Sequence, residues 1–168
     1  VLVGLATLTV LSLSGEEVLD RALDTSATTE ERPLVYTLTL AGIGDHFWAG
    51  TGLGTFDPAF AMYRSTTLQH TWNQAHNTYL ETMFEIGVPA ALVFLLAPLW
   101  IVALCLRGYF IRHRDRVYPL VAVGCSTIAA VHSVFDFSLQ IPAVATTYAV
   151  VLGLGFAQAF STERMAAR

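Results

Sequence analysis

The stretch AHNTYLETMFEIGVPAALVF, residues 75–94, changes character halfway along its length. It begins with a histidine and an asparagine, carries two glutamates, and then becomes a continuous apolar run. Gly87 and Pro89 stand at the change, where a glycine commonly ends one helix and a proline marks a break in the chain. We therefore predict a polar helix that leads directly into a membrane-spanning helix.

The composition indicates a membrane protein. The chain has 168 residues, of which 54% are hydrophobic and 13% charged, and its mean hydropathy is +0.55; soluble domains carry roughly 25% charged residues. Three apolar stretches reach the roughly 17–25 residues that a span needs, namely residues 88–106, 118–134 and 141–160. Residues 1–14 are too short to span, and we interpret them as the end of a transmembrane helix. We accordingly expect the chain to be the C-terminal portion of a longer protein.

Arginines flank the predicted spans unevenly. They cluster in the connection 107–117 and in the tail 161–168, as Arg107, Arg112, Arg114, Arg116, Arg164 and Arg168. Basic residues beside spans mark the cytoplasmic side. This places residues 15–87 and the short link 135–140 on the opposite side, which is the periplasm in a Gram-negative cell. The expected fold class is an all-α polytopic membrane protein with a large helical periplasmic loop.

The outer segment, residues 15–87, is too polar to span a membrane, and its aromatic residues indicate that it folds. Residues 32–45 have a helical pattern with one apolar stripe formed by Leu34, Leu38 and Ala41. The glycine-rich run at residues 50–54 ends this pattern. We expect Asn73 to cap a further helix that runs to Gly87.

Polar residues on that further helix suggest a site. Asn77, Glu81 and Glu85 are spaced by four residues and share one stripe. His76 lies beside the start of the helix, where free N–H groups give a partial positive charge. A catalytic group at this position can reach a lipid-linked substrate at the membrane surface. The alternative is that His76 caps an interfacial helix and that the two acids are simply solvated.

A second pair of ionisable residues, His132 and Asp136, lies four residues apart at the outer end of the predicted span 118–134. Ionisable groups in spans are costly and usually face a cavity or a partner. The topology places His132 at the same membrane face as His76, so we predict that the two histidines and the nearby acids form one site. The alternative is a structural His–Asp pair that joins the last two spans.

The remaining motifs point to neither a nucleotide nor a metal. Gly50, Gly52 and Gly54 form a turn whose N–H groups could face phosphate. The turn lacks the Lys-Ser/Thr of a P-loop and follows no strand, so a tight loop is the alternative. No HExxH or paired CxxC motif is present, and Cys105 and Cys125 fall inside predicted spans. We predict no metal, no cofactor and no nucleic-acid partner.

Taken together, these motifs resemble the O-antigen ligase and polymerase family of membrane glycosyltransferases. The family carries a His-[Asn/Ser/Gln]-x9-Gly motif in its large periplasmic loop, and here this motif starts at His76 and ends at Gly87. A Gly, Thr or Tyr often follows three residues later, where this chain has Ala90. Residues 32–56 and residues 132–143, HSVFDFSLQIPA, are also similar to segments of the family.

The resemblance implies GT-C-like transmembrane helices and glycosyl transfer without a metal. The implied donor is a glycan linked to undecaprenyl diphosphate, and the acceptor is a hydroxyl of a glycan, of lipid A-core or of a protein. The enzyme would lie among the lipids of the bacterial inner membrane with its active face in the periplasm. By motif position, His76 is the catalytic histidine and Arg32 contacts the phosphate.

The other expected site residues have supporting roles. They are Asn77, His132 and Asp136 beside the substrate and, on the grounds of spacing alone, Glu81 or Glu85 as the group that orients the histidine. We expect the family's second phosphate-binding arginine in a part of the protein that precedes this chain.

Two other classes of function stay open. A protein O-oligosaccharyltransferase shares the same motif and differs only in its acceptor. A non-catalytic component of polysaccharide export or flipping would bind glycans without releasing a lipid diphosphate. Release of undecaprenyl diphosphate separates the enzymes from the transporter, and the glycosylated product separates ligase, polymerase and protein transferase.

Overall fold

The structure is a computed structural model that describes residues 31–160, except residues 69 and 113. Every regular element in this part of the chain is helical, and no strand occurs among these residues. Residues 31–45 form a helix. The elements that follow are α2 (Phe56–Phe60), α3 (Thr78–Ile86), α4 (Val88–Ile111), α5 (Val117–His132), η1 (Ser138–Gln140) and α6 (Pro142–Ala159).

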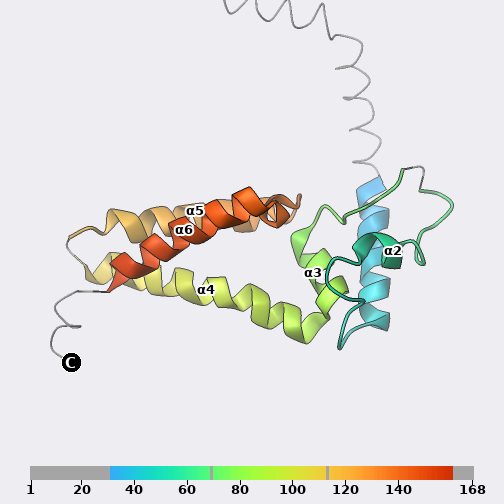
Figure 1. Cartoon of the computed structure of the whole chain (residues 1–168), viewed down its shortest axis with the longest axis horizontal. Helices are drawn as coiled ribbons and strands as arrows, with labels where there is room; N and C mark the ends of the chain where they lie inside the picture. Colours follow the sequence, from blue (N-terminus) through green and yellow to red (C-terminus); the bar gives the residue numbers. More distant parts are fainter. Residues whose placement is uncertain (1–30, 69, 113, 161–168) are drawn as a thin grey trace, which may run out of the picture.

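The three long helices pack against one another in pairs and run side by side (Figure 1). Two close approaches bring helix backbones together: a Cβ on Gly108 would lie 2.6 Å from the Cβ of Ala159, and one on Gly155 would lie 2.3 Å from the Cβ of Ala122. Small residues at such contacts are typical of helices packed within a membrane. Residues 31–45, α2 and α3 gather at one end of this bundle (Figure 1).

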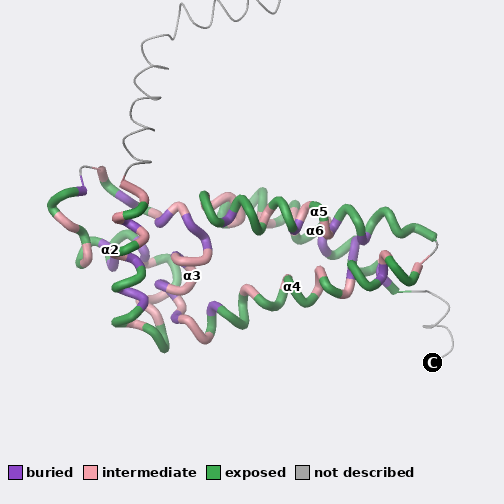
Figure 2. The backbone as a smooth tube through the Cα atoms, turned by 180° about the vertical axis from the view of Figure 1, so that it is seen from behind, coloured by how far each residue is buried: buried purple, intermediate pink, exposed green. Residues whose placement is uncertain are grey.

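Helices α4 and α6, with 24 and 18 residues, are long and apolar enough to cross a membrane. Helix α5 is apolar but has only 16 residues, because it ends at His132 rather than at the predicted residue 134. Two of the three predicted spans thus coincide with helices that are long and apolar enough to cross a membrane, and the third is shorter than expected. Helix α4 continues to Ile111 instead of ending at the predicted residue 106, so the first part of the predicted connection 107–117 is helical. Figure 2 shows long exposed stretches on these helices, whose exposed side chains include Val93, Phe94 and Trp100.

The helix at residues 31–45, α2 and α3, which we call the outer helices, enclose a separate apolar core. This core contains Val35, Ile43, Phe56, Phe60, Trp72 and Phe84. The helical prediction for residues 32–45 is confirmed, but the buried stripe differs by one residue. Val35, Thr39 and Ile43 are buried, whereas Leu34 and Leu38 are only partly buried and Ala41 is exposed. This side of the helix packs closely against α3, because Gly42 has no side chain and leaves room for the ring of Phe84.

Helix α3 begins at Thr78, so the predicted cap Asn73 lies outside it. Its N-cap is Asn77, whose side chain accepts a hydrogen bond of 3.1 Å from the Leu80 N–H. The acids of α3 are also not solvated, because Glu81 and Glu85 are both buried. Glu81 accepts the Ala75 N–H from the loop before α3, and Glu85 accepts the Phe56 N–H at the start of α2. The predicted polar stripe therefore faces the interior of the protein.

Several predicted segments lie outside the described residues. These are the helix end at residues 1–14, the first part of the outer segment at residues 15–30, and the tail at residues 161–168. The link 135–140 and the connection between α4 and α5 lie at opposite ends of the bundle, because α5 runs between them. The outer helices lie at the end of the bundle that contains the link 135–140 (Figure 1).

Candidate functional site

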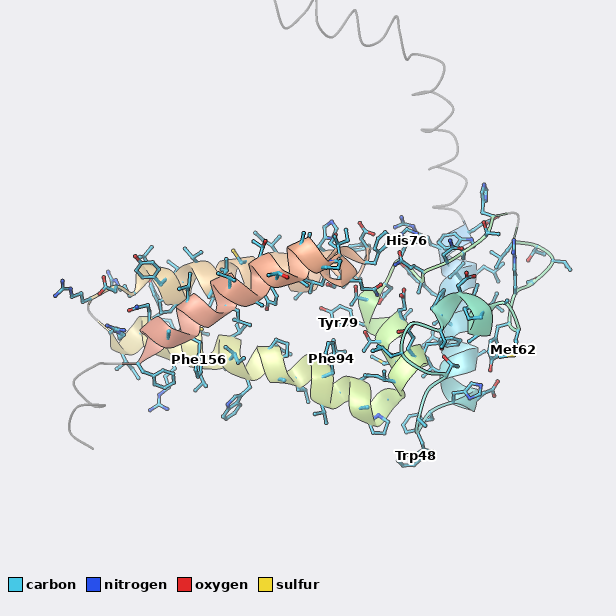
Figure 3. The ribbon with its side chains drawn as sticks, in the orientation of Figure 1. Trp48, Met62, His76, Tyr79, Phe94 and Phe156 are labelled. Carbon is cyan, nitrogen blue, oxygen red and sulfur yellow. The ribbon has the colours of Figure 1, made fainter. Side chains whose placement is uncertain are left out.

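Three segments meet where the outer helices join the bundle: the start of the 31–45 helix, the loop before α3, and the link between α5 and α6. They carry Arg32, His76 and Asp136 respectively. Figure 3 shows His76 beside the ends of α5 and α6 that face the outer helices. Residues separated by more than a hundred positions in sequence therefore come together at one end of the apolar bundle.

The imidazole of His76 lies among a carboxylate and two aromatic rings. Its Nδ1 is 3.5 Å from Oδ1 of Asp136. The ring of Trp72 lies edge-on at 5.5 Å between centroids and the ring of Phe137 at 5.1 Å. About a third of the His76 side chain remains exposed to solvent. The aromatic rings limit how the imidazole can turn, while its exposed part stays open to a substrate.

The backbone of His76 is in the left-handed region, with φ at +50°. This conformation is unfavourable for residues other than glycine, and it persists only where the surroundings impose it. Two hydrogen bonds fix the chain here. The Tyr36 hydroxyl donates to the His76 carbonyl at 3.1 Å, and the buried Ala75 N–H donates to Oε2 of Glu81 at 2.8 Å. The placement of the imidazole thus depends on residues of two helices.

Arg32 reaches the same place from the start of its helix. Its Nη1 donates to the carbonyl of Phe135, the residue before Asp136, at 3.1 Å. Its Nε is buried and has no hydrogen-bond partner among the described residues. A buried N–H without a partner is uncommon and costly in folded proteins. The guanidinium therefore retains donor capacity at the point where it approaches the histidine.

Burial and the charge of Arg32 favour the neutral form of His76. Burial lowers the pKa of His76, the positive charge of Arg32 lowers it further, and Asp136 raises it to a smaller extent. The net pKa is below the usual histidine value of about 6.5. If Nδ1–H points at Asp136, as the contact favours, Nε2 carries the free lone pair and can accept a proton.

Helix α3 is tied to the end of α5 by contacts of its first residues. The Thr78 N–H donates to the Ser133 carbonyl at 2.9 Å, and the Thr78 hydroxyl donates to the Asp136 carbonyl at 3.0 Å. The Tyr79 hydroxyl donates to the Ala130 carbonyl at 2.8 Å (Figure 3). These bonds fix the distance between the loop of His76 and the link of Asp136.

The carboxylates of α3 act on backbone groups and do not touch the imidazole. Glu81 binds the Ala75 N–H, and Glu85 accepts the Phe56 N–H at 3.0 Å. The carboxylate beside His76 is that of Asp136, so the expectation that Glu81 or Glu85 orients the imidazole is not met. Burial raises the pKa of Glu81, against the opposing effect of its hydrogen bond from Ala75.

The structure brings three of the predicted site residues together, namely Arg32, His76 and Asp136. Asn77 serves as the helix cap. His132 donates to or accepts from the Ser138 hydroxyl at 3.1 Å, and the described residues give it no bond to His76 or to the side chain of Asp136. No hydrogen bond therefore joins the two histidines among the described residues, and their expected meeting, like substrate contact by His132, stays a prediction.

The contributions of Tyr36, Trp72, Thr78 and Tyr79 were not predicted from the sequence. Tyr36 follows Arg32 by four residues and so shares its helical face, which was an available signal. The other three are placed by contacts between distant segments, for which the sequence contains no local signal. Among the described residues, no group of three or more His, Cys, Asp or Glu side chains could hold a metal ion.

Comparison with known proteins gives one match. A family model described as O-Antigen ligase matches residues 1–95, which is more than half of the chain. The matched range includes Arg32 and His76, whereas Asp136 lies beyond it. No curated protein and no solved structure matches the chain.

Proposed function

The chain belongs to the O-antigen ligase family, and from this premise we propose that it transfers a glycan from undecaprenyl diphosphate to an acceptor hydroxyl. The observation that carries the proposal is the meeting of Arg32, His76 and Asp136 at one end of apolar helices. A neutral base, an orienting carboxylate and a cation are the groups that such a transfer requires at a membrane surface.

In the proposed reaction, His76 acts on the acceptor. Nε2 accepts the proton of the acceptor hydroxyl as its oxygen forms a bond to the anomeric carbon of the donor sugar. Asp136 holds Nδ1–H and stabilises the imidazolium that forms. The lowered pKa of His76 supports this role, because a neutral imidazole is available as a base at neutral pH.

Arg32 acts on the leaving group. As the new bond forms, the bond between the anomeric carbon and the phosphate oxygen breaks, and the electron pair leaves with the lipid diphosphate. A guanidinium can stabilise this charge through two parallel hydrogen bonds. The bond from Nη1 to the Phe135 carbonyl keeps the side chain in place, and the unpartnered Nε supports a role as donor to phosphate.

The lipid of the donor requires an apolar path that begins near the site. A cavity of about 560 Å³ lies between α5 and α6, and its lining includes His132, Ser138, Leu139 and Tyr148. It starts on the link that carries Asp136 and continues along the bundle. We place the first isoprene units of the donor here, which gives His132 a position beside the lipid rather than beside the acceptor.

We place the site at the periplasmic face of the bacterial inner membrane. The connection between α4 and α5 carries Arg112, Arg114 and Arg116 at the opposite end of the bundle, and basic residues favour the cytoplasm. The lipid-linked donor and the acceptor glycan would then meet in the periplasm, in the synthesis of surface polysaccharide.

The test replaces the base and the cation in the full-length protein and measures release of undecaprenyl diphosphate from a lipid-linked donor. His76→Ala should slow the reaction by roughly 10²–10⁴-fold, the usual contribution of a general base. His46→Ala is the matched control, because this histidine lies in the same outer segment at the far end of the 31–45 helix. It should turn over donor at the wild-type rate.

Arg32 is tested in the same assay. Arg32→Lys keeps the charge but loses the paired hydrogen bonds, so it should retain part of the activity, whereas Arg32→Ala should retain almost none. Normal rates for both His76→Ala and Arg32→Ala in folded protein would contradict the proposed function. If His46→Ala loses as much activity as His76→Ala, the loss reflects a general effect on folding and not a role of His76 in the reaction.

A further inference from the structure

The loop after the 31–45 helix presents two aromatic side chains that the catalytic proposal does not use. Phe47 and Trp48 pack against each other edge to face, with 5.2 Å between ring centroids. Trp48 is 80% exposed and Leu53, in the glycine-rich run, is 81% exposed. Figure 3 shows Trp48 beside the start of α4 and directed away from the rest of the molecule.

Short backbone contacts attach this loop to the point where α4 begins. The N–H of Val88, the first residue of α4, donates to the Phe47 carbonyl at 2.8 Å. A Cβ on Gly87 would lie 2.7 Å from the backbone of Trp48, so the two backbone segments touch without intervening side chains. The loop therefore cannot move along the axis of α4 without breaking these contacts.

The glycine-rich run makes the same attachment from its other side. The N–H groups of Thr51 and Gly52 donate to the carbonyls of Phe84 and Glu85 at 3.0 and 2.8 Å. A Cβ on Gly50 would lie only 2.2 Å from the Glu85 carbonyl oxygen. Gly50 thus allows the loop to lie against the end of α3, and the N–H groups of Gly50 and Gly52 donate to carbonyls of His46 and Glu85 within the protein.

The exposed aromatic pair is continuous with the apolar surface of α4. Just inside the helix, Leu92, Val93 and Phe94 are also exposed. Tryptophan is enriched where a span meets the lipid headgroups, because its ring is apolar and its N–H can bond to polar groups. A tryptophan fixed beside the first residue of a 24-residue apolar helix lies at that depth if the helix crosses a membrane.

We propose that Phe47, Trp48 and Leu53 insert into the headgroup region of the outer leaflet and set the height of the site above the bilayer. The surface fits phospholipid at the border between headgroups and acyl chains. Because α3 joins this loop directly to the loop of His76, a fixed depth for Trp48 fixes the depth of His76. The inference rests on the proposed membrane topology, in which α4 crosses the bilayer from Val88 inward.

The chain contains its own depth markers. Trp100 lies in α4 about 18 Å along the helix axis from Val88, at 1.5 Å per residue, and so falls near the middle of a bilayer whose hydrocarbon core is about 30 Å thick. Trp72 is buried in the outer core. The three positions are predicted to lie at the interface, in the hydrocarbon, and outside the membrane.

The experiment uses full-length protein in phosphatidylcholine vesicles, with variants that keep one tryptophan and carry phenylalanine at the others. Quenching is compared between lipids with a nitroxide near the headgroup and lipids with a nitroxide deep in the acyl chain. Trp48 should be quenched roughly twofold more by the shallow label, and Trp100 more by the deep label. If neither label quenches Trp48, the proposal is wrong, because the side chain is then surrounded by water, by another segment or by a second copy and not by lipid.

Failure of the anchor can be distinguished from failure of the topology. If Trp100 is quenched by the deep label and Trp48 by neither, α4 crosses the membrane and the anchor is wrong. If neither tryptophan is quenched, the topology itself is wrong.

A second measurement avoids multiple substitutions. Trp48→Asp alone should reduce turnover of a full-length lipid-linked donor in vesicles on the order of tenfold, and Trp48→Phe should not, because an acidic group resists insertion. Both variants should turn over a short-chain donor in detergent at the wild-type rate. Equal activity of Trp48→Asp and wild type in vesicles would overturn the anchor.

Discussion

Replacing Glu81 by alanine should slow glycan transfer without weakening the binding of the donor. Oε2 of Glu81 accepts the Ala75 N–H at 2.8 Å, and the two residues are 4% and 0% exposed. Removing the carboxylate leaves this N–H buried without a partner, at a cost of about 1–3 kcal/mol. The affected peptide directly precedes His76, so the disturbance reaches the proposed base through the backbone.

The size of the effect follows from the strain at His76. A left-handed conformation costs a residue other than glycine about 1–2 kcal/mol. With the bond to Glu81 removed, the hydrogen bond from Tyr36 to the His76 carbonyl remains, worth about 1 kcal/mol. The strain and the cost of the unsatisfied Ala75 N–H together then exceed this remaining restraint by about 1–4 kcal/mol. A shift of about 1.4 kcal/mol changes a rate tenfold. We expect kcat to fall roughly 10–100-fold, while KM for the donor changes little.

Glu81→Gln provides a test of the cause. Glutamine keeps an oxygen that can accept the Ala75 N–H, so kcat should stay within roughly threefold of wild type. Burial raises the pKa of Glu81, so the stability linked to its protonation is present below the unfolded pKa and is lost as the pH rises through the folded pKa. A permanently neutral amide does not undergo this loss, and Glu81→Gln should be at least as stable as wild type at neutral pH.

Glu85→Ala is the matched control for the alanine variant. Glu85 is 8% exposed and accepts the Phe56 N–H, which is far from the histidine loop along the chain. Its loss should lower the unfolding temperature to a similar degree but leave kcat per folded molecule unchanged. The assay is initial-rate release of undecaprenyl diphosphate, normalised to folded protein. Equal kcat losses in the two alanine variants, or a Glu81→Gln as slow as Glu81→Ala, would refute the reasoning.

Two further predictions concern pH and the glycine-rich loop. Asp136 raises the pKa of His76, so Asp136→Asn should lower this pKa and move the acid limb of the pH profile of kcat/KM to lower pH. An acid limb that stays in place or moves to higher pH would contradict the contact between Asp136 and His76. Gly50→Ala should destabilise the protein by at least about 3 kcal/mol, because φ is +66° and the new Cβ would meet a carbonyl oxygen. Gly54→Ala, with φ at +73° in open space, should cost only about 1 kcal/mol in denaturant unfolding, and equal losses would rule out the close contact.

Local patterns in the sequence predicted the helices well. The apolar run after Gly87 predicted α4, and the 3.6-residue period predicted the helix over residues 31–45. The start of α3 was misplaced because both Asn73 and Asn77 are good caps, and only the packed structure selects the second. Burial of Glu81 was also beyond a local pattern, since the spacing shows which residues share a face and not what covers that face.

The main residues of the site were predicted from the sequence, but the contacts between them were not. Arg32, His76 and Asp136 were all expected there, but the sequence did not show that the Asp136 carboxylate lies beside His76 while His132 bonds to the Ser138 hydroxyl. Which residue of the α5–α6 link faces the histidine depends on where α5 ends and how the link turns. The positive φ of His76 was not predicted either, because positive φ is uncommon for any residue but glycine, even though histidine adopts it more often than most.

The pKa of His76 depends, in the proposed reaction, on whether the donor is bound. In the free chain burial lowers the pKa of His76, Arg32 lowers it further, and Asp136 acts in the opposite direction. A diphosphate bound by Arg32 would offset the positive charge of that side chain, so its depression of the pKa would weaken while the effect of Asp136 persisted. The proton affinity of the imidazole would therefore increase once the leaving group is in place. An acceptor hydroxyl would then meet a stronger base in the donor complex than in the free enzyme, which favours transfer over activation of water in the absence of donor.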